Sequence, residues 1–391
     1  MSKTKYFICF ALACVAGISC RKEGPAGPES PREAIVFSAN VAETKGAKPL
    51  NALVDLFEQD FSVSAWYTPD GDTFGANSVS YIQNHCFGTL EQREDGDYSA
   101  SVWQGVTPGL SGKAADPAYY PLDGSLTFFS YAPYRSDVSG DSDVELIYSP
   151  ASSITSRMPG YLVGSPLVNF TPSATPSTQI DFVAAAPVLD WRRMGGVVPL
   201  DFSEHLTTAV QFHARYSGNM NDDEGVVISR IIIRDVIGSE YLYFTQSGGS
   251  LGYAWSSDIS PEDGSSSMPK ASYVLEADKA ELIQEDAYLV KDASKYLNQQ
   301  INGRLYLLPQ VLPDEAQLEI TYVIRNKVSG VNLDENVLVY PLVGTADWPM
   351  GKTVKYDITI HVAERKDVSI TTEIIDWEDA GNTHPDQELI Y

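Results

Sequence analysis

The sequence predicts an all-β protein. Short runs that alternate between apolar and polar residues, or that are rich in aromatic and β-branched residues, recur along the chain. Turn residues such as Gly, Pro and Asp bound these runs, and 43% of the residues are hydrophobic, as in a globular protein. Strands that follow one another at short, regular intervals predict an antiparallel sandwich or barrel.

Residues 1–19 have the layout of a signal peptide. Lys3 and Lys5 precede an uncharged apolar run over residues 6–18, which is too short to span a bilayer as a helix. The run ends in AGISC, which resembles the lipobox of bacterial lipoproteins. We therefore expect cleavage before Cys20 and acylation of that cysteine. The alternative is an ordinary secretory leader that is followed by an incidental cysteine.

Residues 20–34 are expected to form a flexible tether, because a charged stretch rich in Pro and Gly cannot build a core. Its start, Arg21–Glu23, resembles the export signal of surface lipoproteins in the Bacteroides group. The net charge of the whole chain is −25, which argues against nucleic acid as a partner and against an electrostatic grip on anionic lipid. Membrane attachment would then depend on the lipid.

The N-terminal domain is predicted over residues 35–188. Its expected strands include residues 35–41, 61–67 and 125–131, and the turn sequences PDG and LDG lie between them. A stretch rich in Ser, Thr and Pro over residues 149–177, followed by the segment 184–196, indicates a boundary near residue 190.

The C-terminal domain is predicted over residues 189–391. Its expected strands are residues 209–216, 226–236, 241–245, 304–308, 316–324, 337–342, 354–362 and 368–375. Residues 277–300 differ, because their apolar residues recur at helical spacing, so one or two short helices are expected there.

Four stretches resemble the fimbrillin-like (Mfa-like, FimA-like) proteins of the Bacteroides and Porphyromonas group. They are IVFSA with ETKG at residues 35–46, YPL through FFSYAPY at 120–134, DFV with VPLDF and HL at 181–206, and LLPQ with WPMGK at 307–352. The motif IDW at residues 375–377 fits the closing strand of that family. Taken in order, these stretches span nearly the whole chain that follows the leader.

The resemblance implies two transthyretin-like antiparallel β-sandwich domains in tandem and a subunit of a cell-surface fimbria. In that family a trypsin-like protease can remove the N-terminal strand, and a neighbouring subunit then fills the groove with a donor strand. Lys45 and Lys48 are the nearest candidate cut points, although the best-known family pattern has Arg at the cut. A C-terminal donor would use residues 367–377. An uncut subunit would serve as an anchor or a tip.

No sequence motif supports an enzyme or a cofactor. GGSLG at residues 248–252 matches the nucleophile-elbow pattern but lies between two strand-like runs, which favours a hairpin turn. The five histidines show no metal-ligand spacing, and we expect no metal site. The acidic run NMNDDE at 219–224 offers oxygen ligands for calcium but lacks the spacing of a known loop, which favours a solvated turn.

Two functions therefore remain open. The first is a stalk, anchor or tip subunit at the outer membrane, partnered by other fimbrial subunits through strand exchange. The second is a monomeric surface lipoprotein that binds glycans or host proteins.

Overall fold

The structure is a computed structural model that describes residues 32–41, 60–88, 102–107, 115, 117–136, 143–202, 204–257, 259–261, 264–277, 287–297, 305–363 and 367–377. The described residues are nearly all β, as predicted. The strands of the first half are β1 (Phe37–Val41), β2 (Phe61–Thr68), β3 (Val79–Gly88), β4 (Gln104–Gly105), β5 (Ser125–Ala132), β6 (Val144–Ile147), β7 (Leu167–Phe170), β8 (Val183–Trp191), β9 (Val198–Phe202) and β10 (Glu204–His205).

The second half adds β11 (Thr208–Ser217), β12 (Glu224–Ile237), β13 (Glu240–Ser247), β14 (Ser250–Trp255), β15 (Lys270–Glu276), β16 (Lys295–Tyr296), β17 (Leu305–Leu307), β18 (Gln317–Asn326), β19 (Asn332–Pro341), β20 (Lys352–His361) and β21 (Asp367–Asp376). Two short helical turns, α2 (Ser152–Thr155) and η1 (Pro176–Thr178), accompany them. No helix among the described residues is long and apolar enough to cross a membrane.

The first body is built on a six-stranded antiparallel sheet in the order β10-β8-β5-β2-β3-β4, and its central strands β2 and β5 are buried on both faces. On one face, Phe61 and Phe128 of this sheet pack against the β1–β9 pair. On the other face, Trp66 and Phe129 pack against Phe244 of the sheet ordered β14-β13-β7-β6. This arrangement explains why β2 and β5 read as nearly continuous apolar and aromatic runs.

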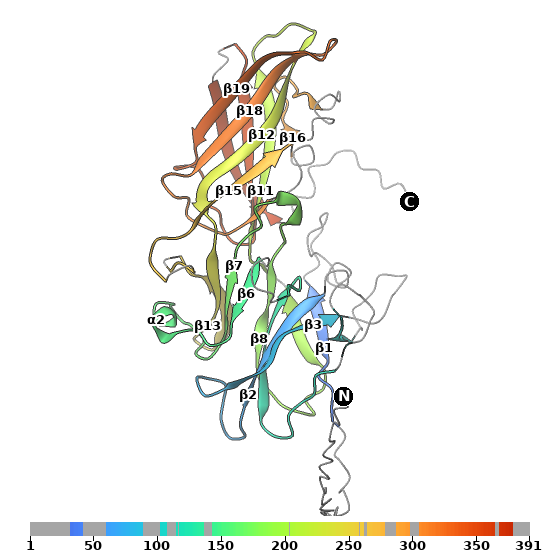
Figure 1. Cartoon of the computed structure of the whole chain (residues 1–391), viewed down its shortest axis with the longest axis vertical. Helices are drawn as coiled ribbons and strands as arrows, with labels where there is room; N and C mark the ends of the chain where they lie inside the picture. The colour runs from blue at the N-terminus through green and yellow to red at the C-terminus, as the bar shows by residue number, and fades with distance from the viewer. Residues whose placement is uncertain are drawn as a thin grey trace, which may run out of the picture.

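The second body is a sandwich of two sheets, ordered β16-β11-β20-β21, with β17 beside β11, and β15-β12-β18-β19. The two sheets enclose the largest core cluster, in which Phe212, Ile231 and Tyr356 are fully buried. Most pairs are antiparallel, but β11 and β20 run parallel. Figure 1 shows the two bodies following one another along the long axis of the molecule.

The chain passes between the bodies more than once. The boundary expected between residues 188 and 189 falls inside β8 (Val183–Trp191), and β9, which follows it, pairs with β1. After β12 in the second body, the chain returns to form β13 and β14, and β13 pairs with β7 of the first body. The first body is therefore assembled from segments that lie on either side of residue 188, whereas every strand of the second body follows that residue.

Of the described residues in the range 277–300, Ala287 has 3-10 helical conformation, and the helical prediction is wrong for residues 288–297. Within residues 287–297 there is no α-helix, and Lys295–Tyr296 instead form β16, which pairs with β11. Leu289 and Leu297 are buried in the core of the second body, so their helical spacing reflects burial from a loop and a short strand. The remaining residues of that range lie outside the described part of the chain.

The hairpin prediction for residues 248–252 is confirmed. Ser247 of β13 pairs with Ser250 of β14, and Gly248 and Gly249 between them both have positive φ angles. Such φ values are readily adopted by glycine, which explains the residue choice in this turn.

Candidate functional site

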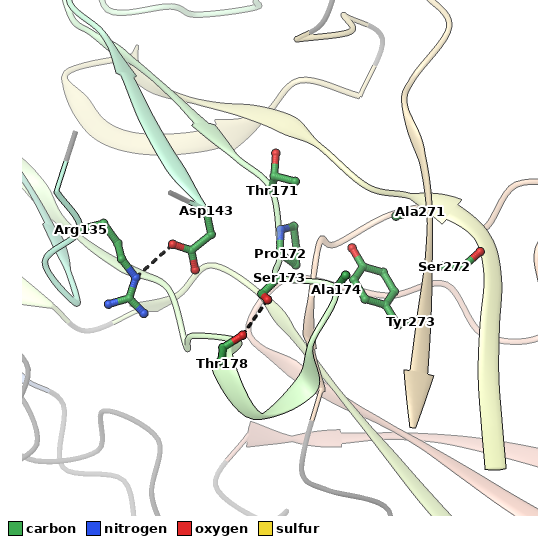
Figure 2. Close-up of a pocket in the computed structure, with 10 residues that line it drawn as sticks. All are labelled: Arg135, Asp143, Thr171, Pro172, Ser173, Ala174, Thr178, Ala271, Ser272 and Tyr273. Atoms are coloured by element: carbon green, nitrogen blue, oxygen red, sulfur yellow. Dashed lines mark hydrogen bonds and ion pairs between the residues drawn. The ribbon is translucent and has the colours of Figure 1, made fainter. Parts of the chain in front are cut away.

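A cleft of about 760 Å³ lies between the two bodies. One wall comes from the first body, where Arg135 follows β5, Asp143 precedes β6 and residues 171–178 follow β7. The other wall is Ala271–Tyr273 of β15 in the second body. Figure 2 shows the hydroxyl of Tyr273 directed from β15 toward the segment that contains Pro172 and Ser173.

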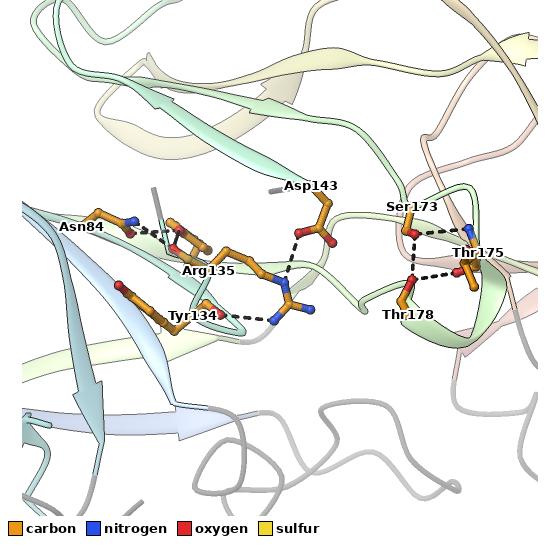
Figure 3. Close-up of polar contacts among 8 residues, drawn as sticks. Asn84, Tyr134, Arg135, Asp143, Ser173, Thr175 and Thr178 are labelled. Carbon is orange, nitrogen blue, oxygen red and sulfur yellow. Dashed lines mark hydrogen bonds and ion pairs between the residues drawn. The ribbon is translucent and has the colours of Figure 1, made fainter. Parts of the chain in front are cut away.

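Arg135 and Asp143 form an ion pair in the first wall, with 3.0 Å between Nε and Oδ1. The backbone of Arg135 is held in place by two hydrogen bonds. Its carbonyl accepts one from Asn84 Nδ2 at 2.8 Å and one from the Tyr131 hydroxyl at 3.2 Å. Asn84 is buried and also accepts a hydrogen bond from the Ser62 hydroxyl. The guanidinium therefore extends from an anchored strand end, as Figure 3 shows.

The 171–178 segment is held by hydrogen bonds of its own. The hydroxyls of Ser173 and Thr178 lie 2.7 Å apart, and Thr178 donates to the carbonyl of Thr175 at 3.0 Å (Figure 3). Gln179 ties this segment to the second body, because its Oε1 accepts a hydrogen bond from the Tyr306 backbone N–H at 2.8 Å. One direct hydrogen bond thus links the end of this segment to β17 of the second body.

A second candidate site is the position of β1 in the first body. Phe37 is fully buried, and its ring meets those of Phe87 and Phe128 edge-on, with centroid distances of 4.8 and 5.3 Å. We call the surfaces that surround β1 the β1 groove, lined by Phe61, Phe87, Trp103, Phe128, Val198, Leu200 and Phe202.

Both edges of β1 are hydrogen bonded. β1 pairs in parallel with β9 from Phe37↔Val198 to Val41↔Phe202. On its other edge, Phe37 exchanges backbone hydrogen bonds of 2.9 and 2.8 Å with Trp103. Without β1, the groove would expose an aromatic pocket and unpaired backbone groups, which together form a template for another strand.

The last strand, β21, lies at the edge of its sheet and pairs with β20 over its whole length. Its end is fastened to the first body, because Trp377 stacks on His205 of β10 with a centroid distance of 4.3 Å. His205 in turn has Nδ1 3.0 Å from both carboxylate oxygens of Asp181. Two of the stretches identified in the sequence, 181–206 and 375–377, therefore meet in space.

The residues predicted for lipidation and proteolysis, Cys20, Lys45 and Lys48, lie outside the described residues. Among the described residues, no group of three or more His, Cys, Asp or Glu side chains is arranged to hold a metal ion. In the acidic run, Asp223 accepts a hydrogen bond from Asn326, and Glu224 accepts one from Asn221.

The cleft residues were not identified from the sequence. Arg135 and Asp143 belong to the first body and Tyr273 to the second, so the fold and not the local sequence brings them together. The one local signal is the density of hydroxyl residues in 171–178, a composition that is also typical of a domain boundary.

The fold is similar to that of a solved fimbrial protein from Bacteroides vulgatus, at 16% identity and a TM-score of 0.55, with 88% of this chain and 99% of that chain covered. Two candidate cell adhesion proteins also align, at 15% identity and a TM-score of 0.45 each. The one from Bacteroides uniformis covers 90% of this chain and 100% of its own, and the one from Bacteroides ovatus covers 88% and 98%. No family model and no curated protein matches the sequence.

Proposed function

We propose that the protein is a structural subunit of an adhesive cell-surface fimbria, a stalk, anchor or tip, built from two transthyretin-like sandwiches and joined to its neighbours by strand exchange. The observation that carries the proposal is the position of β1, an N-terminal strand buried in an aromatic groove and hydrogen bonded on both edges. The fold of the Bacteroides vulgatus fimbrial protein supports the same proposal.

The position of the candidate cut sites fits this role. β1 ends at Val41, and Lys45 and Lys48 follow shortly after it in the sequence. Cleavage there would separate β1 from the rest of the chain, so that only non-covalent contacts would hold it in the groove. An incoming strand could then replace it and restore both sets of hydrogen bonds.

The donor in this proposal is β21. Val368 and Ile370 pack against the second core and Ile374 is exposed, so apolar side chains recur on one side of the strand. A strand that fills a groove needs this alternation, because every second side chain points into it. As an edge strand, β21 has fewer hydrogen bonds to break than an internal strand would have.

Export is proposed to proceed through a lipoprotein stage. Acylation of Cys20 would bring the chain to the outer membrane, and cleavage at Lys45 or Lys48 would then release the folded bodies for assembly. An uncleaved subunit would stay at the surface as an anchor, with its lipid as the attachment.

Trypsin treatment of the mature protein tests the assembly proposal. We expect cleavage at Lys45 or Lys48 to convert monomer into ladders that resist mild SDS, and we expect a Lys45→Ala, Lys48→Ala double variant to stay monomeric. Lys270→Ala, at a partly exposed lysine of β15, is the matched control and should polymerise like the parent. Monomer that persists after complete cleavage, confirmed by mass spectrometry, would refute the proposal.

A further inference from the structure

The strand β19 (Asn332–Pro341) forms one edge of the sheet β15-β12-β18-β19, and Figure 1 shows it beside β18 along one side of the second body. No described residue pairs with its outer edge. Of the other edge strands, β4, β10 and β16 have two residues each and β6 has four, whereas β19 has ten. A long free edge of this kind is a template for a strand of another chain.

The backbone of β19 directs alternate residues toward this free edge. The Leu342 N–H, just after the strand, donates to the Ala316 carbonyl, just before β18, at 2.8 Å, and the pairing that follows is regular. Residues of an antiparallel pair alternate between bonding to the partner strand and facing away from it, so the even-numbered residues of this stretch bond to β18. The backbone N–H and C=O groups of Glu335, Val337 and Val339 therefore point outward.

The side chains of β19 are apolar on both faces of the sheet. Leu338 and Leu342 belong to the core of the second body. Val337 and Val339 lie on the other face and are 57% and 56% exposed, and Leu333 near the start of the strand is 51% exposed. An antiparallel sheet with one face in water normally carries polar residues on that face. The exposed valines of β19 would therefore gain stability from a cover.

The middle of β19 lacks the devices that usually protect an edge strand. Such strands are commonly blocked by lysine, by proline or by a β-bulge. In β19 the one proline is its last residue, Pro341, no Lys or Arg occurs, and the one irregularity in its pairing with β18 lies opposite Ile324 and Arg325. Its only charged residues are Asp334 and Glu335. The rest of the strand is uncharged and open to pairing.

The positions of these two carboxylates make β19 complementary to a second copy of itself. When two copies pair antiparallel about Val337, Val337 opposes its own counterpart, Glu335 opposes Val339 and Asp334 opposes Tyr340. No carboxylate then meets another, whereas pairing about Glu335 would place two carboxylates directly opposite each other, which is destabilising. Antiparallel self-pairing is also two-fold symmetric, so one contact uses the free edges of both copies.

We propose that β19 is a lateral docking edge at which two copies of this chain pair antiparallel about Val337 and join their sheets into one continuous sheet. The valines of the two strands then cover one another on the exposed face. The pairing uses no residue of β1 or β21 and needs no cleavage, so it is independent of strand exchange. One strand pair is a small interface, so the association is weak and dissociates in SDS, unlike the ladders described above.

Sedimentation velocity of the uncleaved mature protein provides the first test, with Cys20→Ala to remove the lipid. We expect the weight-average mass to rise from that of one chain toward that of two as the protein concentration increases. Added NaCl should raise the dimer fraction, because the net charge of −25 on each copy opposes association and salt screens it. A mass that stays at that of one chain up to about 1 mM, where even a millimolar affinity is visible, would overturn the proposal. Association that weakens with salt would also contradict it.

Charged variants then locate the contact. Val337→Lys places two ammonium groups opposite each other, and Val339→Glu places a carboxylate opposite Glu335 of the second copy. We expect each to raise the dissociation constant of the dimer by about fivefold. Val339→Lys should bind more tightly than Val339→Glu, because it offers Glu335 an opposite charge.

The matched controls are Val163→Lys and Val163→Glu, at a valine that is also 57% exposed but lies in a turn of the first body. Both should associate like the parent, and thermal unfolding verifies that every variant is folded. Unchanged association in both Val337→Lys and Val339→Glu would reject β19 as the contact.

Disulfide capture tests the register of the pair. In a pair centred on Val337 the two Val337 Cα atoms would lie about 5.5 Å apart, within the range that a disulfide bridges. In the Cys20→Ala background the remaining cysteine of the mature chain is Cys86, which is buried. Val337→Cys should then give a disulfide-linked dimer under mild oxidation, and Val163→Cys should not. Equal amounts of linked dimer in the two variants would reject this pairing.

Discussion

Glu240 is a carboxylic acid in an apolar interior. It is 2% exposed, its Oε2 has no partner among the described residues, and it lies at the start of β13 with Leu242 and Phe244 at alternate positions after it. Burial raises the pKa of Glu240 from 4.5 to about 8, because the ionised form is poorly solvated there. The side chain therefore stays protonated in the folded protein at neutral pH.

Stability should fall as the pH rises toward 8. The unfolded chain releases the Glu240 proton above about pH 4.5, whereas the folded protein keeps it up to about pH 8, so each pH unit in this window lowers the free energy of unfolding. Between pH 6.5 and 8 we expect a loss of about 1.5 kcal/mol from this residue. Urea unfolding of the parent and of Glu240→Gln at several pH values would measure this loss in the free energy of unfolding, and the glutamine variant should not show it.

The effect of Glu240 on stability occurs in a different pH range from the effects of the buried groups His213 and Asp60. Burial lowers the pKa of His213 from 6.5 to about 4 and raises the pKa of Asp60 from 3.8 to about 6. The contribution of His213 to the free energy of unfolding decreases as the pH falls from 6.5 toward 4. The contribution of Asp60 decreases as the pH rises from 3.8 toward 6. Both effects are largely complete by pH 6.5. An identical slope in the parent and in Glu240→Gln above that pH would contradict the assignment.

At the scale of elements, β21 combines two roles in the proposal, because it completes its own sheet and donates to a neighbour. Ile370 and Thr371 are adjacent on this strand but face opposite sides, and only Ile370 packs against the core of the second body. The same alternation would place Ile370 inside the β1 groove of the next subunit and leave Thr371 outside it.

We therefore expect Ile370→Asp to prevent a subunit from donating, whereas Thr371→Asp should still donate. After trypsin treatment, each variant is mixed with an excess of cleaved parent protein that carries an affinity tag. Ile370→Asp should still accept a strand from the parent and so appear at chain ends, and it should shorten the SDS-resistant ladders. Ladders as long as those of the parent alone would exclude β21 as the donor.

The sequence predicted the strands well because each strand is defined by local alternation and by nearby turn residues. SLTFFSYA at β5 and the glycines between β13 and β14 are examples in which local chemistry decides the structure. The helical prediction is wrong for residues 288–297, because pairing of Lys295–Tyr296 with β11 outweighs the helical spacing of apolar residues.

The cleft could not be predicted in the same way. Its polar residues are distant in sequence, and Asn84, which holds Arg135 in place, is more distant still. Their proximity depends on strand order, which a single sequence does not encode in any local pattern.

At the scale of the whole molecule, the first body takes strands from both halves of the chain. A fragment of residues 35–188 lacks β9, which pairs with β1, and lacks β13 and β14, which complete the sheet over Trp66 and Phe129. The exposed apolar surface of such a fragment would destabilise it. The division at residue 188 therefore does not separate two complete cores.

We expect residues 35–188 not to fold alone. Residues 189–391 hold every strand of the second body, so we expect them to form that body, and we expect the two fragments to associate when they are expressed together. Circular dichroism and size-exclusion chromatography of each fragment and of the pair provide the measurement. A soluble 35–188 fragment with a cooperative thermal transition would show that β9, β13 and β14 are dispensable for the first body.

Surface delivery is expected to depend on Cys20 and not on the folded bodies. Cys20→Ala should block acylation and reduce the amount of protein accessible to antibody on intact cells, while purified protein keeps the thermal transition of the parent. Lys22→Ala serves as a neighbouring control and should reach the surface if the lipid alone is required. Normal surface display of Cys20→Ala would contradict the lipoprotein proposal.

The passage from β12 to β13 has a mechanical consequence. Only Gly238 and Ser239 separate the two strands, and a Cβ at Gly238 would lie 2.5 Å from the Cβ of Ala271. The connection between the bodies is therefore short and closely packed. The hydrogen bond from the Tyr306 N–H to Gln179 Oε1 also joins the bodies, and unlike the Trp377–His205 stack it does not involve the proposed donor strand β21. We expect the molecule to behave as a stiff rod, so that a chain of such units under shear would bend at the joints between subunits.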